Sequence, residues 1–269
     1  MKSVFAGLAL YFVAFVGIAV AGNGGVVRIG VVQLPTANDG NFSAMLEYAK
    51  RAKTQGAQIV IFPETSDMGW LNPDAFYHSE PIPGKTTEKF ADIARAADVW
   101  VAAGLAERGS KVADNPVTYE AFDAAILISP DGALVLKERQ HNVVKNAFSS
   151  CPTAFGSGGC QYTAGTLDDL KVVETPFGRV GMLICADAYT YDVSALDAVK
   201  AQKPDLVLIP WGVTAETAAQ CGQEDYNATQ YASKAAKYLG STYVVGANGQ
   251  GDRPYGRSWY WRLQRLCES

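Results

Sequence analysis

The sequence has few of the residues that build metal or nucleic-acid sites. Only two histidines occur, His78 and His141, and neither stands at a metal-ligand spacing. There is no Cys-x-x-Cys pair, so a zinc site is not expected. There is no Lys/Arg run either, and the formal net charge is −4, which argues against nucleic-acid binding. The glycine-rich stretch at 246–251 lacks phosphate-loop spacing, so we expect no nucleotide cofactor.

Low-complexity segments and internal repeats are also absent from the 269 residues. Hydrophobic residues make up 48% of the chain, which is enough to bury one large core. We therefore expect a single folded domain.

The first 21 residues have the layout of a secretory signal peptide. Lys2 gives a positive start, residues 4–20 are apolar, small or aromatic, and residues 19–21 (AVA) form an A-x-A cleavage pattern before the turn-prone 22–25. We therefore expect a signal peptide at 1–21 and the folded domain at 22–269, in a secreted or extracellular protein. The alternative is an uncleaved membrane anchor, since the apolar run approaches spanning length.

Short apolar runs rich in β-branched residues alternate with helical patterns along the rest of the chain. Strands are predicted at 26–34, 59–62, 99–105, 206–211 and 242–248, helices at 41–54, 85–97, 194–203 and 225–239, and hairpins at 119–136 and 172–185. Because such apolar strands are buried on both faces, helices must cover them. The pattern predicts a layered α/β fold with mixed sheets.

Polar residues stand where two of the buried strands end. Glu64 follows the strand at 59–62, and Cys185 ends the apolar strand of the hairpin at 172–185. Taken alone, Glu64 would be read as a surface acid and Cys185 as an inert buried thiol. Groups at strand ends line the active-site crevice of layered α/β folds, so their joint occurrence predicts a site.

Several segments resemble motifs of the carbon–nitrogen hydrolase (nitrilase-like) superfamily. They are 59–64 (IVIFPE), 175–187 (TPFGRVGMLICAD), 205–211 (DLVLIPW), 244–251 (VVGANGQG) and 255–258 (YGRS). The resemblance implies a four-layer αββα sandwich with two mixed sheets, often paired into homo-oligomers. It also implies a Glu-Lys-Cys set that cleaves non-peptide C–N bonds. With the signal peptide, it points to secreted pantetheinase- and biotinidase-like members.

The resemblance assigns chemical roles to Glu64 and Cys185. Glu64 would be the general base that accepts the thiol proton, and Cys185 would attack a small linear amide to form a thioester. The backbone N–H beyond Cys185 would help hold the developing oxyanion. This chemistry requires no cofactor and no metal.

One position departs from the family pattern. Aligning Gly132, Arg139 and Asn142 with the pattern puts Gln140 where the catalytic lysine is expected. The protein could then be a catalytically impaired relative that binds a ligand or a partner. Lys137 or Lys145 could instead replace the lysine through a bulge or a shifted turn, although a regular strand would point Lys137 to the opposite face.

The C-terminal end is a second departure, because members of the family normally continue with two more strands after about residue 262. The chain ends at Ser269, so we expect these strands to be missing. Either the gene is truncated or mis-spliced, or the chain is a short variant that relies on a partner.

The five cysteines fit an oxidising compartment if Cys185 stays free. The pairings expected for the others are Cys151–Cys160 and Cys221–Cys267. Asn41 and Asn227 head N-x-S/T tripeptides, which accept N-glycans in hosts that glycosylate.

Overall fold

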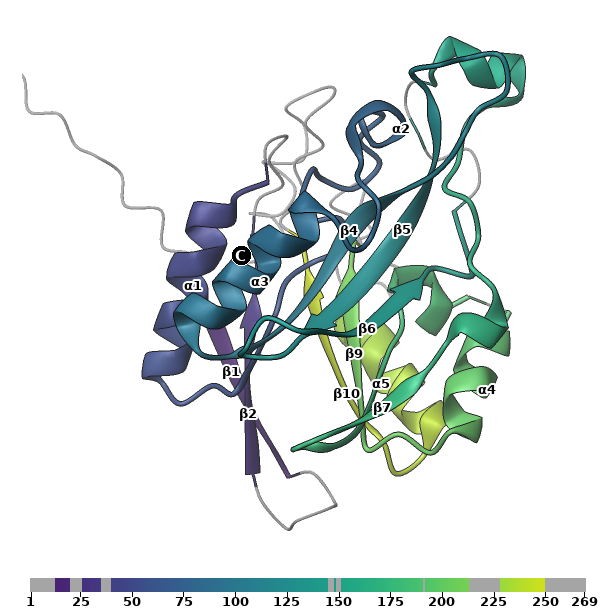
Figure 1. The fold of residues 1–269 in the computed structure, drawn as a ribbon. Coiled ribbons are helices and arrows are strands. Elements are labelled where there is room, and N and C mark those ends of the chain that lie inside the picture. The colour runs from purple at the N-terminus through teal and green to yellow at the C-terminus, as the bar shows by residue number, and fades with distance from the viewer. Residues whose placement is uncertain are drawn as a thin grey trace, which may run out of the picture.

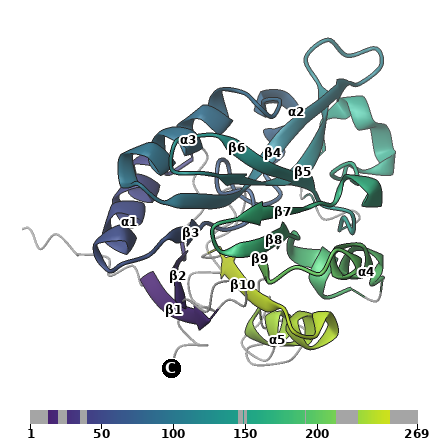
Figure 2. The same cartoon turned by 60° about the horizontal axis from the view of Figure 1, so that its bottom comes forward.

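The computed structural model describes residues 13–19, 26–34, 40–144, 148, 151–190, 192–212 and 228–249. Within these ranges two β-sheets lie face to face, and helices cover the outer face of each sheet (Figures 1 and 2). Both sheets contain parallel and antiparallel pairs. The predicted α/β sandwich with two mixed sheets is therefore confirmed.

The first sheet has six strands in the order β1 to β6. Their bounds are β1 (Val13–Ala19), β2 (Val26–Val32), β3 (Ile59–Ile61), β4 (Trp100–Lys111), β5 (Tyr119–Ile128) and β6 (Leu134–Arg139). Strands β2, β3 and β4 are parallel to one another, and the remaining neighbours are antiparallel. Helices α1 (Phe42–Thr54) and α3 (Lys85–Ala97) pack on the outer face, and the short α2 (Ala75–His78) lies between β3 and α3 in the chain.

The second sheet has four strands in the order β10-β9-β8-β7. Their bounds are β7 (Val172–Thr175), β8 (Gly178–Met182), β9 (Leu206–Trp211) and β10 (Tyr243–Asn248). Helices α4 (Ser194–Ala201) and α5 (Ala228–Leu239) cover its outer face (Figure 2). Three short 3₁₀ helices complete the described elements: η1 (Thr153–Gly158), η2 (Leu167–Asp169) and η3 (Cys185–Ala188).

Side-chain alternation along the strands decides which polar groups enter the space between the sheets. On β5, Ala124 and Ile126 pack with α1 and α3, whereas Ala125 and Leu127 pack toward the second sheet. Asp123 has the parity of Ala125 and Leu127. It is fully buried and faces the interior between the sheets.

The observed elements follow the predicted ones with few shifts. The helix predicted at 85–97 has these bounds in the structure, whereas β4 continues to Lys111 because it pairs with β5 along most of its length. Strand β1 was not predicted, and it falls inside the predicted signal peptide 1–21. It pairs antiparallel with β2, and cleavage of the signal stays a prediction.

Two further predictions concern a membrane anchor and the C-terminal end. Among the described residues, no helix combines the length and the apolar character needed to cross a bilayer. The C-terminal segment 250–269, which includes the end after residue 262 where two strands were expected to be missing, lies outside the described residues, as do Cys221, Cys267 and Asn227.

Candidate active site

Glu64 is held where three strands meet. It follows β3, its backbone N–H donates to the carbonyl of Trp211 on β9 (3.3 Å), and the N–H of Gly104 on β4 donates to the carbonyl of Pro63 (3.1 Å). A Cβ at Gly104 would lie 2.6 Å from the Glu64 Cα, so only glycine allows this approach of β4. The carboxyl group is therefore fixed by backbone contacts between the two sheets.

Cys185 ends the run from β8 and begins η3. Its φ is +40°, a left-handed conformation that costs a non-glycine residue on the order of 1 kcal/mol or more. The thiol is buried and free. Such a sharp turn directs the sulfur out of the strand and into the interior near Glu64.

Asp187 braces the turn that carries Cys185. Its carboxylate accepts backbone hydrogen bonds from Ile184 (3.3 Å), His141 (3.0 Å) and Asn142 (2.7 Å). Burial raises the pKa of Asp187 to about 6, although these three donors oppose the rise. The brace ties the segment after β6 to the turn after β8, which brings Gln140 to the side of Cys185.

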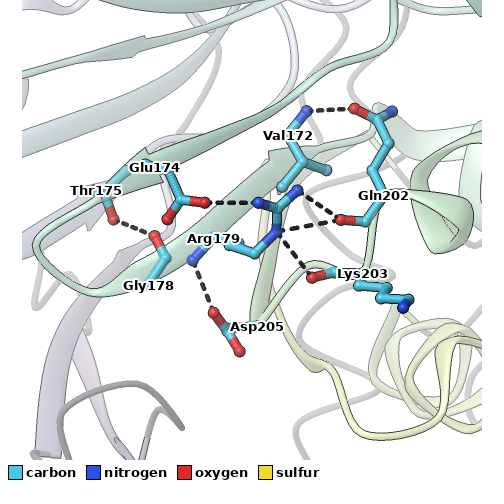
Figure 3. Close-up of polar contacts among 8 residues, drawn as sticks. All are labelled: Val172, Glu174, Thr175, Gly178, Arg179, Gln202, Lys203 and Asp205. Atoms are coloured by element: carbon cyan, nitrogen blue, oxygen red, sulfur yellow. Dashed lines mark hydrogen bonds and ion pairs between the residues drawn. The ribbon is translucent and has the colours of Figure 1, made fainter.

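The starting end of β8 is anchored by a separate set of polar contacts (Figure 3). The Arg179 N–H donates to Asp205 Oδ2 (2.8 Å), and the Asp205 N–H donates back to the Arg179 carbonyl (2.8 Å). The Arg179 guanidinium pairs with Glu174 (2.6 Å) and donates to the carbonyl of Gln202 (2.8 Å). Strand β8 is thus fixed at the start by Arg179 and at the end by Asp187.

Three acidic groups meet at the centre of the site. The Glu64 carboxyl lies against the Cys185 thiol and against the carboxyl of Asp123, and all three side chains are essentially fully buried. Burial raises the pKa of both carboxyls well above the usual range. The Cys185 thiol raises the pKa of Glu64 further while the hydrogen bond with Asp123 opposes the rise, and Glu64 raises the pKa of Asp123 further. A carboxylate of high pKa beside a thiol is a suitable base for that thiol.

The thiol itself is neutral at rest. Burial raises the pKa of Cys185 to about 11, and hydrogen bonds with the Gly212 N–H, Tyr189 and Glu64 oppose the rise. The Tyr189 hydroxyl lies 3.7 Å from Sγ. A Cβ at Gly212 would overlap the Glu64 carboxylate, so glycine is required there. With this pKa, Cys185 would act as a nucleophile only by passing its proton to a neighbouring base such as Glu64.

An aromatic stack forms the wall beside the sulfur. Tyr189 stacks on Tyr231 of α5 with ring centroids 4.2 Å apart and on Trp211 of β9 at 6.1 Å. The proximity of Cys185 is the main cause that raises the pKa of Tyr189, and burial adds to it. Tyr189 therefore stays protonated and can donate to the sulfur.

Gln140, which the alignment matches to the catalytic lysine, lies beside the turn that carries Cys185. Its side chain is buried, and Nε2 donates to the carbonyl of Ile184, the residue before the nucleophile (3.3 Å). Lys137 lies on the opposite face of β6, where Nζ pairs with Glu107 (2.9 Å). The strand is thus regular at Lys137, whereas Lys145 lies outside the described residues.

Sequence reasoning missed two members of the site, Asp123 and Tyr189. Asp123 is the one charged residue in the apolar run 121–129, and a lone acid in a buried strand is a usable signal. Tyr189 follows the nucleophile by four residues, but its contact with sulfur depends on the η3 turn. Among the described residues, no cluster of three or more His, Cys, Asp or Glu side chains is arranged for a metal ion.

The Cys151–Cys160 disulfide is confirmed, with Cα atoms 5.5 Å apart. It pins the loop that contains η1. The loop lies beside a pocket of about 430 Å³ whose lining includes Cys160 and Tyr162.

Comparisons with known proteins find a nitrilase and two amidases among the similar sequences. The chain is 29% identical over 153 residues to a nitrilase of Pyrococcus abyssi (55% of this chain, 50% of the relative). It is 28% identical over 153 residues to the deaminated glutathione amidase of Homo sapiens (55% and 44%). An omega-amidase of Bos taurus is 25% identical over 163 residues (60% and 55%). The chain therefore spans about half the length of the curated relatives it matches.

Solved structures show the same fold. A mutant of the Nesterenkonia AN1 amidase from the nitrilase superfamily superposes with a TM-score of 0.61 at 17% identity, over 84% of this chain and 77% of that one. In another mutant of that amidase, the acetamide moiety of fluoroacetamide is covalently added at the active-site cysteine. The sequence model of the carbon–nitrogen hydrolases matches residues 28–262. This chain therefore belongs to the carbon–nitrogen hydrolase family.

Proposed function

We propose that this protein is an amidase-type hydrolase that cleaves the non-peptide C–N bond of a small linear amide. The observation that carries the proposal is the contact of the Glu64 carboxyl with the Cys185 thiol in a buried site. The Gly212 N–H and the Tyr189 hydroxyl both contact the Cys185 sulfur. A nucleophile, its base and two donors are thus held together by both sheets.

The proposed reaction uses Glu64 and Cys185 in turn. Glu64 accepts the thiol proton while sulfur bonds to the amide carbon, and the proton then passes to the departing nitrogen as the C–N bond breaks. Water next gives its proton to Glu64 and attacks the thioester. When the C–S bond breaks, the acid product leaves and the sulfur regains a proton from Glu64.

A second candidate function is supported by Gln140. It replaces a fixed cation by a neutral amide beside the nucleophile, and Lys137 is engaged with Glu107 on the other face of the sheet. Loss of one donor to a developing oxyanion typically costs about 10² to 10³ in rate. A catalytically impaired relative that binds a ligand or a partner is the alternative.

The cellular setting is part of the proposal. We propose a secreted, glycosylated protein of the pantetheinase- and biotinidase-like kind, which acts on a small-molecule amide and pairs with a second copy of itself. The Cys151–Cys160 disulfide supports an oxidising compartment. An uncleaved signal would instead leave the protein on a membrane.

The test is turnover of a panel of small amides by the protein expressed through a secretory route, followed as ammonia or amine release. Cys185→Ala is the blank, and Gln140→Lys is the companion variant. Turnover by the wild type that disappears in Cys185→Ala supports the hydrolase. Turnover confined to Gln140→Lys supports the impaired relative, and turnover that survives in Cys185→Ala contradicts the assignment of the nucleophile.

A further inference from the structure

Two fully buried carboxyl groups in the site lack a compensating donor. Glu64 is 1% exposed and Asp123 is 0% exposed, and within the described part of the chain their four oxygens find partners only in each other and in the Cys185 thiol. Buried carboxyls are normally paired or hydrogen-bonded, because desolvation of an unpaired one is costly. This pair faces Cys185, so a ligand that brings hydrogen-bond donors to the site could fill its unused acceptors.

The other charged groups nearby are already engaged. Asp67 accepts the Ala106 N–H at 3.2 Å, and Asp187 accepts three backbone N–H groups. Lys137 and Arg139 both pair with Glu107 on the outer face of the sheet. Among the described residues, the carboxyl pair therefore has a neutral neighbour, Gln140, where the family pattern supplies a cation.

The charge of the tetrahedral adduct differs between two kinds of electrophile. When a thiolate adds to a neutral amide, the tetrahedral adduct carries a negative oxygen, which needs a cationic or strong donor. When a thiolate adds to an amidinium or a guanidinium, the adduct is neutral. Such an electrophile instead needs carboxylates, which its parallel N–H groups bind in a bidentate fork.

We infer that the pair formed by Glu64 and Asp123 binds a planar nitrogen cation, and that amidines and small alkylguanidines are substrates of this site. The inference rests on the proposed roles of Cys185 and Glu64 and adds a class of C–N bond to them. The cationic substrate itself supplies the positive charge that the neutral Gln140 does not provide.

The reaction balances for a guanidinium. Glu64 takes the thiol proton as the C–S bond forms, and then gives it to the departing nitrogen as the C–N bond breaks. Ammonia and an S-linked isothiouronium on Cys185 result. Water adds to that carbon and gives a proton to Glu64, and the C–S bond breaks to release a urea, with the hydroxyl proton returning to sulfur. The Glu64 proton leaves with ammonia as ammonium.

The test uses binding, so that it does not depend on turnover. Butylguanidinium and the neutral butylurea are titrated calorimetrically into the Cys185→Ala protein, which keeps both carboxyls. We expect the guanidinium to bind about 10- to 100-fold more tightly, the range for hydrogen bonds to charged groups. Adding Asp123→Asn, which keeps the shape but cannot give up a proton to become a carboxylate beside the cation, should abolish this preference.

A matched control is Asp67→Asn, which removes a buried acid that already has a backbone donor. The preference should persist in that variant. Equal affinity for the two ligands, tighter binding of the urea, or a preference unchanged by Asp123→Asn would each overturn the inference. If amides are turned over while butylguanidinium does not bind preferentially, the inference fails and the proposed function stands.

Discussion

Buried acids dominate this molecule at the scale of single residues. Five carboxyls that are nearly or fully buried have a raised pKa, and burial is the first cause for each: Glu64, Asp67, Asp123, Glu138 and Asp187. A folded state that holds protons more tightly than the unfolded state loses stability as pH rises. The fold should therefore tolerate mild acid better than mild alkali.

Glu138 gives the clearest case for measurement. Burial raises its pKa to about 8, Oε1 accepts the Lys171 N–H (2.7 Å), and Oε2 has no partner among the described residues. Below about pH 4.5 the group is protonated in both states, and between pH 4.5 and 8 only the folded state keeps the proton. Glu138→Gln should thus gain stability relative to the wild type as pH rises, on the order of 3 kcal/mol by pH 8.5.

Urea unfolding of both proteins at pH 4.5 and pH 8.5 measures this gain. Glu47→Gln, which removes an exposed acid on α1, is the control. A Glu138→Gln variant that tracks the wild type at both pH values would contradict the account of Glu138.

The sequence predicted the site residues that end apolar strands, and it missed those placed by tertiary contacts. Glu64, Cys185 and Gln140 were singled out from motif and spacing along the chain. Asp123 joins them only because β5 pairs with β4 and because the alternation of side chains along β5 points Asp123 toward the interior between the sheets. Tyr189 reaches the sulfur only through the turn of η3, which the strand pattern before it does not reveal.

At the scale of elements, the hairpin of β7 and β8 places the nucleophile, and Gly178 makes that hairpin possible. Its φ is +99°, and a Cβ there would lie 2.5 Å from Asp205 Oδ2, the acceptor of the Arg179 N–H (Figure 3). Gly178→Ala should therefore lower the free energy of unfolding by about 1 to 3 kcal/mol.

Gly240→Ala is the matched control, because Gly240 has a similar φ of +87° and a Cβ there would meet no described atom within 4 Å. Chemical denaturation should show a larger loss for Gly178→Ala than for Gly240→Ala. Equal losses would mean that the overlap with Asp205 costs nothing.

The elements themselves were largely predictable, since periodicity identifies buried strands and amphipathic helices. Their ends were less so, because β4 extends to Lys111 through pairing with β5 rather than through a local apolar pattern. The order of the strands in each sheet, which decides that Gln140 meets Ile184, depends on long-range pairing that spacing does not encode.

At the scale of the whole molecule, cleavage of the signal peptide decides where the mature chain begins. Cleavage after Ala21 would remove β1 and uncover the outer edge of β2. We predict that the protein secreted by a eukaryotic host begins at Gly22. Mass spectrometry of the N-terminal peptide measures this, and a chain that still begins at Met1 would favour the membrane-anchored alternative.

The central claim is that substrate carbon becomes bonded to Cys185 during turnover, with Glu64 as the base. The most direct test is acid quenching of the protein during turnover of an amide, followed by mass spectrometry of the peptide that contains Cys185. The account predicts an added acyl group on Cys185, absent from the Cys185→Ala protein, which should not turn over. Turnover with an unmodified Cys185 peptide, or turnover that persists in Cys185→Ala, would contradict it.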